Sequence, residues 1–239
     1  MTLVGGPRVP YTTDGLIGVW DFNNPLCYPG TGITTFDRSG YESDGTLVNS
    51  PIYGTEPRGN FQFNGTTQYI DLGTPEILFP TNAITLSGWV SRVAYSFTRE
   101  PIIGNNHPGF AGTFFGYRLQ MTVGSNNWIY ATFDLADGTS NTVVNYDNDI
   151  GADINIWYHL TGTWDGSTMT IYINGTTYSN STSFSGPIAY DKTISTRIAR
   201  QRNNIEFTGK ISLVTMYNRA LRPDEIDQNY NLLRGQFNG

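Results

Sequence analysis

The chain has 239 residues, only 14% of them charged, and a formal net charge of −6 at pH 7. A net negative surface argues against non-specific binding to nucleic acid or to an anionic membrane. The single cysteine, Cys27, excludes an internal disulfide, so packing alone has to stabilise the fold. Abundant glycine (27 residues) and tyrosine (15 residues) favour many short strands joined by tight turns.

The first 14 residues contain two glycines and two prolines and few large apolar side chains. We expect residues 1–14 to form an N-terminal arm and residues 15–239 to form a single domain. No charged segment followed by an apolar run opens the chain, which predicts no signal peptide. No stretch approaches the roughly 20 apolar residues that span a bilayer, so we expect no membrane partner.

Alternation of apolar and polar residues predicts the first strands. We expect one strand over residues 16–22 and a core strand over residues 83–93, with Trp89 on the opposite face from its aliphatic residues. Residues 60–72 predict a hairpin about an Asn-Gly turn. The prolines and glycines of residues 99–116 predict an irregular segment.

The middle of the chain predicts a second group of strands. Residues 117–123 and 127–135 are expected to pair about a Gly-Ser-Asn turn, and residues 142–146 to form a further short strand. Residues 147–153 are rich in Asp and Asn, which predicts an acidic loop.

Residues 157–175 give the strongest local signal in the chain. Two alternating strands flank an Asp-Gly turn, and an Asn-Gly turn follows them. Both dipeptides are typical of hairpins, because the two central residues of a type I′ turn need positive φ. One face of the second strand is expected to enter the core through Met169, Ile171 and Ile173.

The last elements are two strands, over residues 197–200 and 208–217, and one helix. Pro223 suits the first helical turn, and the acidic residues after it interact favourably with the helix dipole. We expect Gly235 to stop the helix. Its apolar face would carry Ile226, Tyr230 and Leu233.

Six motifs in order resemble the laminin-G-like group of the concanavalin A-like lectin/glucanase superfamily. They span roughly residues 15 to 233 and are GLIGVWDF, DRSGYESDGTL, FNGTTQYIDLG, ITLSGWV, WYHLTGTWDGSTMTIYINGT and FTGKISLVTMYNRALRPDEI. The resemblance implies an all-β fold, a two-sheet antiparallel jelly-roll sandwich with one sheet concave and one short C-terminal helix.

The opening YTTDGLIGVWDFNNPLCYPGTGITTFDRSG is similar to openings of laminin-G-like domains in virion structural proteins of tailed phages, particularly marine ones. This resemblance implies a protein made in the host cytoplasm and located in the virion, on capsid or tail. Other virion proteins would be its partners through the N-terminal arm, cell-surface glycans would be further candidates, and a homo-oligomer is compatible with this role.

Glycosidases of the superfamily need two carboxylates across the scissile bond, usually two residues apart on one strand. Glu42 and Asp44 have this spacing but lie in a predicted turn, and Glu225 and Asp227 lie on the predicted helix, where their side chains diverge. We therefore expect no enzymatic activity.

Nucleophilic catalysis is not indicated either. His107 and His159 are the only histidines, and neither adjoins a nucleophile-elbow motif. We expect hydrogen-bonded or surface histidines and, at Cys27, a structural thiol.

Calcium is the one cofactor that the resemblance suggests, and the sequence establishes no cofactor. Calcium binds six to eight oxygens. Asp37 and Asp44 frame one turn and are the first candidate ligands; the cluster in residues 147–153 is the second. An alternative for both clusters is structural, because Asp in turns often accepts hydrogen bonds from its own backbone.

Carbohydrate binding requires exposed aromatic rings beside amides or carboxylates. The candidates are Trp128 with Asn126 and Asn127, Tyr146 in its Asn/Asp-rich setting, and the pair Tyr95 and Phe97. The other tryptophans occur inside strand motifs and are expected in the structural core: Trp20, Trp89, Trp157 and Trp164.

Three functions remain open. The first is a non-enzymatic phage virion or decoration protein that contacts other virion proteins and adheres to glycans. The second is a bacterial carbohydrate-binding module, with or without calcium. The third is a glycoside hydrolase with a displaced catalytic pair. Jelly rolls host many unrelated functions, so the fold alone does not decide among them.

Overall fold

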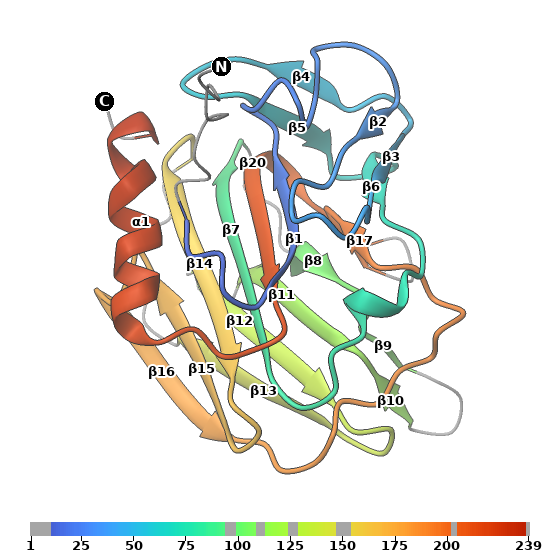
Figure 1. The fold of residues 1–239 in the computed structure, drawn as a ribbon, viewed down its shortest axis with the longest axis vertical. Coiled ribbons are helices and arrows are strands. Elements are labelled where there is room, and N and C mark those ends of the chain that lie inside the picture. Colours follow the sequence, from blue (N-terminus) through green and yellow to red (C-terminus); the bar gives the residue numbers. More distant parts are fainter. Residues whose placement is uncertain are drawn as a thin grey trace, which may run out of the picture.

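The computed structural model describes residues 11–93, 99–108, 113–123, 129–146, 154–201 and 205–237. Two antiparallel sheets of eight strands face each other and form a sandwich, and one helix lies on the outside (Figure 1). The predicted fold class, an all-β two-sheet jelly roll with a C-terminal helix, is confirmed. No helix among the described residues is long and apolar enough to cross a membrane.

Sheet A carries the helix on its outer face, and sheet B forms the other layer. In spatial order sheet A contains β16 (Tyr178–Ser183), β15 (Thr168–Ile173), β14 (Trp157–Trp164), β7 (Ile84–Arg92), β20 (Thr208–Tyr217), β5 (Asn60–Asn64) and β4 (Ile52–Gly54), with β1 (Leu16–Asp21) also paired to β20. Sheet B contains β13 (Asn141–Tyr146), β12 (Ile129–Ala136), β11 (Tyr117–Val123), β8 (Arg99–Gly104), β17 (Arg197–Ile198), β6 (Tyr69–Asp71), β3 (Gly45–Val48) and β2 (Thr34–Thr35).

Two short ribbons and two helical elements complete the described residues. They are β9 (His107–Pro108) paired with β10 (Phe114–Phe115), β18 (Arg200–Gln201) paired with β19 (Ile205–Glu206), the 3₁₀ turn η1 (Glu76–Leu78), and α1 (Pro223–Phe237).

The hairpin of β14 and β15 forms as predicted, with Met169, Ile171 and Ile173 fully buried. The Asn-Gly turn that follows β15 has positive φ at both Asn174 (53°) and Gly175 (72°), as predicted for type I′. The first turn is different from the predicted type I′, because positive φ occurs at Gly166 but not at Asp165. The Asp165 carboxylate instead accepts the backbone N–H groups of the two residues after the glycine, at 2.9 and 2.8 Å.

The apolar residues form two clusters. The larger one fills the space between the sheets, and the smaller one fills the space between sheet A and α1. All four tryptophans assigned to structure are buried: Trp20 and Trp164 between the sheets, Trp89 and Trp157 beneath the helix. The predicted alternation of β7 is confirmed, since Trp89 faces the helix while the aliphatic residues face sheet B.

The helix does not stop at Gly235 as predicted but continues to Phe237. The ring of Phe237 stacks on Trp89 with centroids 4.2 Å apart, and Arg58 donates through Nε to the Gln236 side chain at 2.8 Å. These contacts hold the last turn in place against the weak helix propensity of glycine.

The hairpin predicted for residues 60–72 is wrong. Its two strands belong to different layers, β5 to sheet A and β6 to sheet B. Phe61 and Phe63 on one strand and Ile70 on the other are all buried in the core between the sheets. The Asn64 side chain accepts three backbone N–H groups at 3.0 to 3.3 Å and organises the turn that carries the chain from one layer to the other.

The segment predicted to be irregular, residues 99–116, contains β8 in the middle of sheet B. A bulge explains why alternation did not reveal it: Pro101 pairs with Gln120, but Ile103 pairs with Leu119. As a result the adjacent residues Ile102 and Ile103 both face the core.

Most of the predicted arm lies outside the described residues, and its division from the body remains a prediction. Its described end contacts the body. Tyr11 is buried in the cluster beneath α1, and the backbone N–H of Thr12 donates to Asn229 Oδ1 of the helix at 2.9 Å.

Candidate functional site

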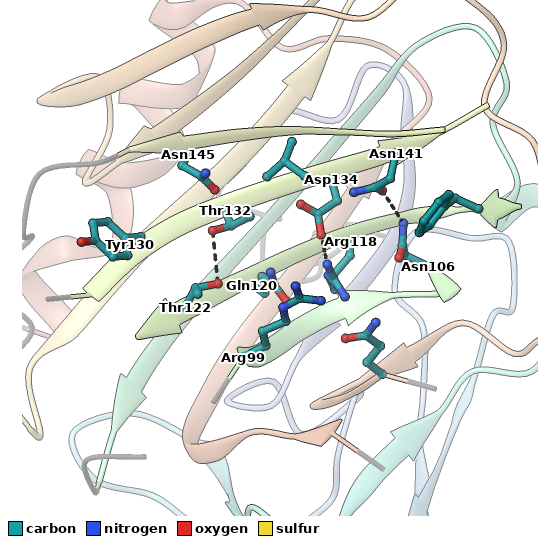
Figure 2. A pocket seen from close by; sticks show the side chains of 13 residues that line it. Arg99, Asn106, Arg118, Gln120, Thr122, Tyr130, Thr132, Asp134, Asn141 and Asn145 are labelled. Carbon is teal, nitrogen blue, oxygen red and sulfur yellow. Dashed lines mark hydrogen bonds and ion pairs between the residues drawn. The ribbon is translucent and has the colours of Figure 1, made fainter. Parts of the chain in front are cut away.

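The outer face of sheet B is hollowed into a cleft of about 380 Å³ (Figure 2). Strands β11, β12 and β13 form its floor, and side chains from β8, β10, β18 and the residue before β9 complete it. The lining is mostly polar and consists of Arg99, Asn106, Phe114, Arg118, Gln120, Thr122, Tyr130, Thr132, Asp134, Asn141, Val143, Asn145 and Gln201.

The floor follows from the strand period of two. In β11 the fully buried residues Tyr117, Leu119 and Met121 alternate with the cleft residues Arg118, Gln120 and Thr122. The same alternation in β12 buries Ala131, Phe133 and Leu135 and directs Tyr130, Thr132 and Asp134 into the cleft. Antiparallel register then aligns the two polar rows, as the pairs Arg118–Asp134, Gln120–Thr132 and Thr122–Tyr130.

A buried ion pair lies at the centre of the floor. Arg118 donates through Nη2 to Asp134 Oδ2, and the two residues are 4% and 0% exposed. Burial raises the pKa of Asp134, and the neighbouring guanidinium opposes this shift. The pair fixes the position of both side chains below the cleft.

Several buried polar atoms of the floor have no hydrogen-bond partner among the described residues. They are Nε and Nη1 of Arg118, Oδ1 of Asp134, Oε1 of Gln120 and Oε1 of Gln201. Gln120 is 2% exposed and Gln201 7% exposed, and all four residues line the cleft. Because buried polar atoms are rarely left unpaired, these donors and acceptors are suited to a polar ligand in the cleft.

Half-buried aromatic side chains lie near both ends of the floor. Tyr130 lies near the start of β12, and Phe114 lies near the end, where Gly138 N–H donates to its carbonyl at 2.9 Å. At about 3.4 Å per residue, β12 places these ends roughly 20 Å apart. Asn106 donates to Asn141 at 3.1 Å beside Phe114. The cleft therefore offers rings at its ends and amides and hydroxyls between them.

The structure brings none of the predicted sugar-binding residues into the described lining. Trp128, Asn126 and Asn127 lie outside the described residues, in the connection between floor strands β11 and β12, as do Tyr95 and Phe97 between β7 and β8. Tyr146 is half-buried and its ring packs against Tyr178 at 5.5 Å. It contacts the core between the sheets, whereas its neighbour Asn145 lines the cleft.

The candidate calcium ligands have a different role in the structure. Asp37 accepts two hydrogen bonds on each carboxylate oxygen, from Val19 N, Ser39 N, Ser39 Oγ and Ser43 N, at 2.5 to 3.2 Å. Asp44 Oδ1 accepts the Asp37 N–H at 2.9 Å. With its lone pairs taken up by donors, Asp37 does not fit a calcium ligand in this arrangement.

No group of three His, Cys, Asp or Glu among the described residues is arranged to hold a metal ion. The calcium site at Asp37 and Asp44 stays a prediction, and the second cluster, residues 147–153, lies outside the described residues.

Three reactive side chains of the described residues lie in structural positions away from the cleft. His159 lies beneath α1, with Nε2 2.8 Å from Ser87 Oγ, and burial lowers its pKa to about 3. Cys27 is buried, which raises the pKa of its thiol to about 12. Glu225 on α1 accepts two hydrogen bonds from Arg219, at 2.8 and 2.7 Å. The predicted hydrogen-bonded histidine and structural thiol are confirmed at His159 and Cys27.

A jelly-roll sandwich of two antiparallel sheets is the architecture of concanavalin A-like domains. Residues 64–227 match the laminin-G family model described as the concanavalin A-like lectin/glucanases superfamily, and the chain belongs to that superfamily. No curated protein matches the chain in sequence.

Solved structures share the fold at low sequence identity. One is domain 4 of AbnA, a GH43 extracellular arabinanase from Geobacillus stearothermophilus, in complex with arabinotriose: TM-score 0.64, 17% identity, over 91% of this chain and 97% of that one. Others are the binding domain of botulinum neurotoxin DC in complex with SialylT (0.68, 16%) and that of Paraclostridial Mosquitocidal Protein 1 (0.66, 16%). Our chain spans about half of these two, 52% of each.

Proposed function

We propose that this domain is a non-catalytic glycan-binding module whose ligand lies in the cleft on sheet B. The observation that carries the proposal is the row of buried, unpartnered polar atoms on the cleft floor. Sugar hydroxyls both donate and accept, so they suit the guanidinium donors of Arg118 as well as the side-chain oxygens of Gln120 and Gln201. The arabinotriose and SialylT complexes of similar folds support a sugar as the ligand.

Hydrolysis is not part of the proposal. A glycosidase needs two carboxyl groups on either side of the scissile bond. The described lining of the cleft contains one, Asp134, and its ion pair with Arg118 leaves it poorly placed to act as an acid or a nucleophile. The chemistry of the lining therefore favours binding over bond cleavage.

Gln120→Leu is expected to weaken glycan binding by about 5- to 100-fold. Leucine keeps the volume of the side chain but removes the amide, and an unmade hydrogen bond to a buried partner costs roughly 1–3 kcal/mol. A glycan array that includes arabinotriose would identify the ligand, and calorimetry would then measure Kd. Gln62→Leu on β5 of sheet A is the matched control and should bind normally.

Two results would contradict the proposal. One is an array without saturable binding by the wild-type domain. The other is a ligand that the Gln120→Leu variant binds as tightly as the wild type does.

The setting we propose for this module is a phage virion, as a structural or decoration protein on capsid or tail. The resemblance of residues 11–40 to virion proteins supports this setting. In a virion the N-terminal arm would contact other virion proteins, and the cleft would bind glycans on a cell surface.

Deleting residues 1–10 is expected to abolish incorporation into particles while the midpoint of thermal unfolding stays unchanged. The deletion ends before Tyr11, because removing that buried ring and the hydrogen bond of Thr12 would also destabilise the body. Immunoblots of purified particles measure incorporation, and the 1–14 deletion is the destabilised comparison. Normal incorporation of the shorter deletion would refute the tether.

The second candidate is a bacterial carbohydrate-binding module, favoured by the likeness to domain 4 of the arabinanase, which our chain matches over nearly its whole length. The two settings share the cleft and differ in the neighbouring genes. Capsid and tail genes beside the reading frame support the first, and genes for polysaccharide-degrading enzymes support the second.

A further inference from the structure

A second arginine reaches into the cleft without a carboxylate partner. Arg99 begins β8 and is exposed, and it forms no ion pair with any described residue. Figure 2 shows its side chain extending beside Gln120 toward Arg118. Burial lowers the pKa of Arg118 and the charge of Arg99 adds to this shift, while at Asp134 the same charge opposes the rise in pKa that burial causes.

The charges of the cleft do not balance. Among the described residues of the lining, Arg99 and Arg118 stand against one carboxylate, Asp134, while the chain as a whole carries a net charge of −6. The cleft is thus a local positive site on an acidic protein. An anion seated there would compensate the excess charge where walls of low dielectric strengthen the attraction.

The donors of Arg118 suit such an anion. Only Nη2 is engaged by Asp134, so Nε and Nη1 are buried donors that need an acceptor. A guanidinium forms charge-assisted hydrogen bonds with a carboxylate or sulfate, and two parallel bonds of this kind add energy and geometric specificity. Arg99 reaches the same region from the neighbouring strand and adds a second guanidinium.

We propose that the cleft selects a glycan that carries an anionic group, a carboxylate or a sulfate, seated between Arg99 and Arg118. This inference rests on the proposed function. The neutral part of the glycan then lies along Gln120, Thr132 and Asn141 toward the aromatic ends of the cleft.

The test uses paired probes that differ only in charge. Oligogalacturonate and its methyl ester test a carboxylate, and a sulfated galactan oligosaccharide and its neutral, desulfated form test a sulfate. The acidic member of at least one pair should bind at least tenfold more tightly to the wild type. Its log K should fall as log salt concentration rises, because salt screens the attraction.

Arg99→Gln should remove that preference by weakening the acidic probe about 10- to 100-fold, at least tenfold more than it weakens the neutral one. Arg222→Gln is the matched control: it makes the same change of charge at an exposed arginine directly before α1. Circular dichroism and thermal unfolding confirm that both variants are folded. Arg99 is exposed, so its loss should leave the midpoint unchanged.

The outcomes separate the two proposals. If neutral and acidic members bind equally, or if Arg99→Gln keeps the preference, the anionic selectivity is wrong and the glycan-binding function stands. If neither these probes nor any other glycan on the array binds, the proposed function fails together with the selectivity.

Discussion

Asp134→Ala is expected to reduce the free energy of unfolding by about 3 kcal/mol, the lower end of the range for removing one partner of a buried ion pair. The variant leaves the Arg118 guanidinium in a position 4% exposed, without its carboxylate. For a domain of this length the midpoint of thermal unfolding should fall by roughly 6–12 °C. Calorimetry at pH 7 measures the shift.

Replacing both partners separates lost attraction from uncompensated charge. The double variant Arg118→Met with Asp134→Leu should be clearly more stable than Asp134→Ala, because neither a charge nor its partner remains. Glu76→Ala, which breaks the exposed pair with Lys192, is the control and should change stability by no more than about 1 kcal/mol. A double variant less stable than Asp134→Ala would show that the pair itself stabilises the sheet.

The domain is expected to lose about 2 kcal/mol of stability between pH 7 and pH 5 through His159 alone. Burial lowers the pKa of this imidazole from 6.5 to about 3 in the folded protein. Between those values the unfolded chain binds a proton that the folded protein does not, so stability falls as pH falls. The contribution is complete above pH 6.5 and is lost at about 1.4 kcal/mol per pH unit on the way to pH 3.

The surroundings of His159 explain the shift. Its ring packs against Trp89 and Tyr230, with centroids 5.2 and 5.9 Å away, and its Nδ1 is buried without a partner. A protonated ring would place a second N–H, and a positive charge, in this apolar layer between sheet A and α1.

Urea unfolding at pH 7 and pH 5 measures the loss, in a window where few carboxylates titrate. His159→Gln should remove the pH dependence, and the matching change at the other histidine, His107→Gln, should retain it. If His159→Gln keeps the full dependence, the loss has another source.

The sequence predicts strands well where one face is apolar and the other is not. In β14 and β15 this alternation, together with the Asp-Gly turn between them, identified the strands, and the tryptophans in strand motifs are buried as expected. It does not reveal which sheet a strand joins. Phe61 and Ile70 both face the core, but from opposite layers, so β5 and β6 were mistaken for a hairpin.

Rules that use only neighbouring residues in the sequence also fail where contacts with distant residues determine the local structure. Strand β8 was not predicted, because a bulge directs its two adjacent isoleucines to the same side and breaks the alternation. Strand β16 was not predicted because its residues are polar and mostly exposed. Gly235 lies inside the helix because Phe237 stacks on a tryptophan far away in the sequence.

The cleft was harder to predict than the fold. Aromatic residues beside Asn-rich or Asp-rich sequence directed attention to Trp128, Asn126, Asn127 and Tyr146, whereas the described cleft is lined mostly by polar residues on strands. The signal was present: two paired strands alternate core residues with Arg118-x-Gln120 and Thr132-x-Asp134. The sequence does not show whether the side chains on the outer face of a sheet are covered by solvent, by a helix or by the walls of a cleft.

The pairing of β20 has a consequence for how the protein is made. This late strand lies between β7 and two early strands, β5 and β1, so its register with Leu16–Asp21 joins the two ends of the chain. A nascent polypeptide emerging from the ribosome cannot complete sheet A until nearly all of it has been translated. Until then β1 lacks its partner strand and β5 is paired with β4 alone, which favours slow maturation and a need for chaperones.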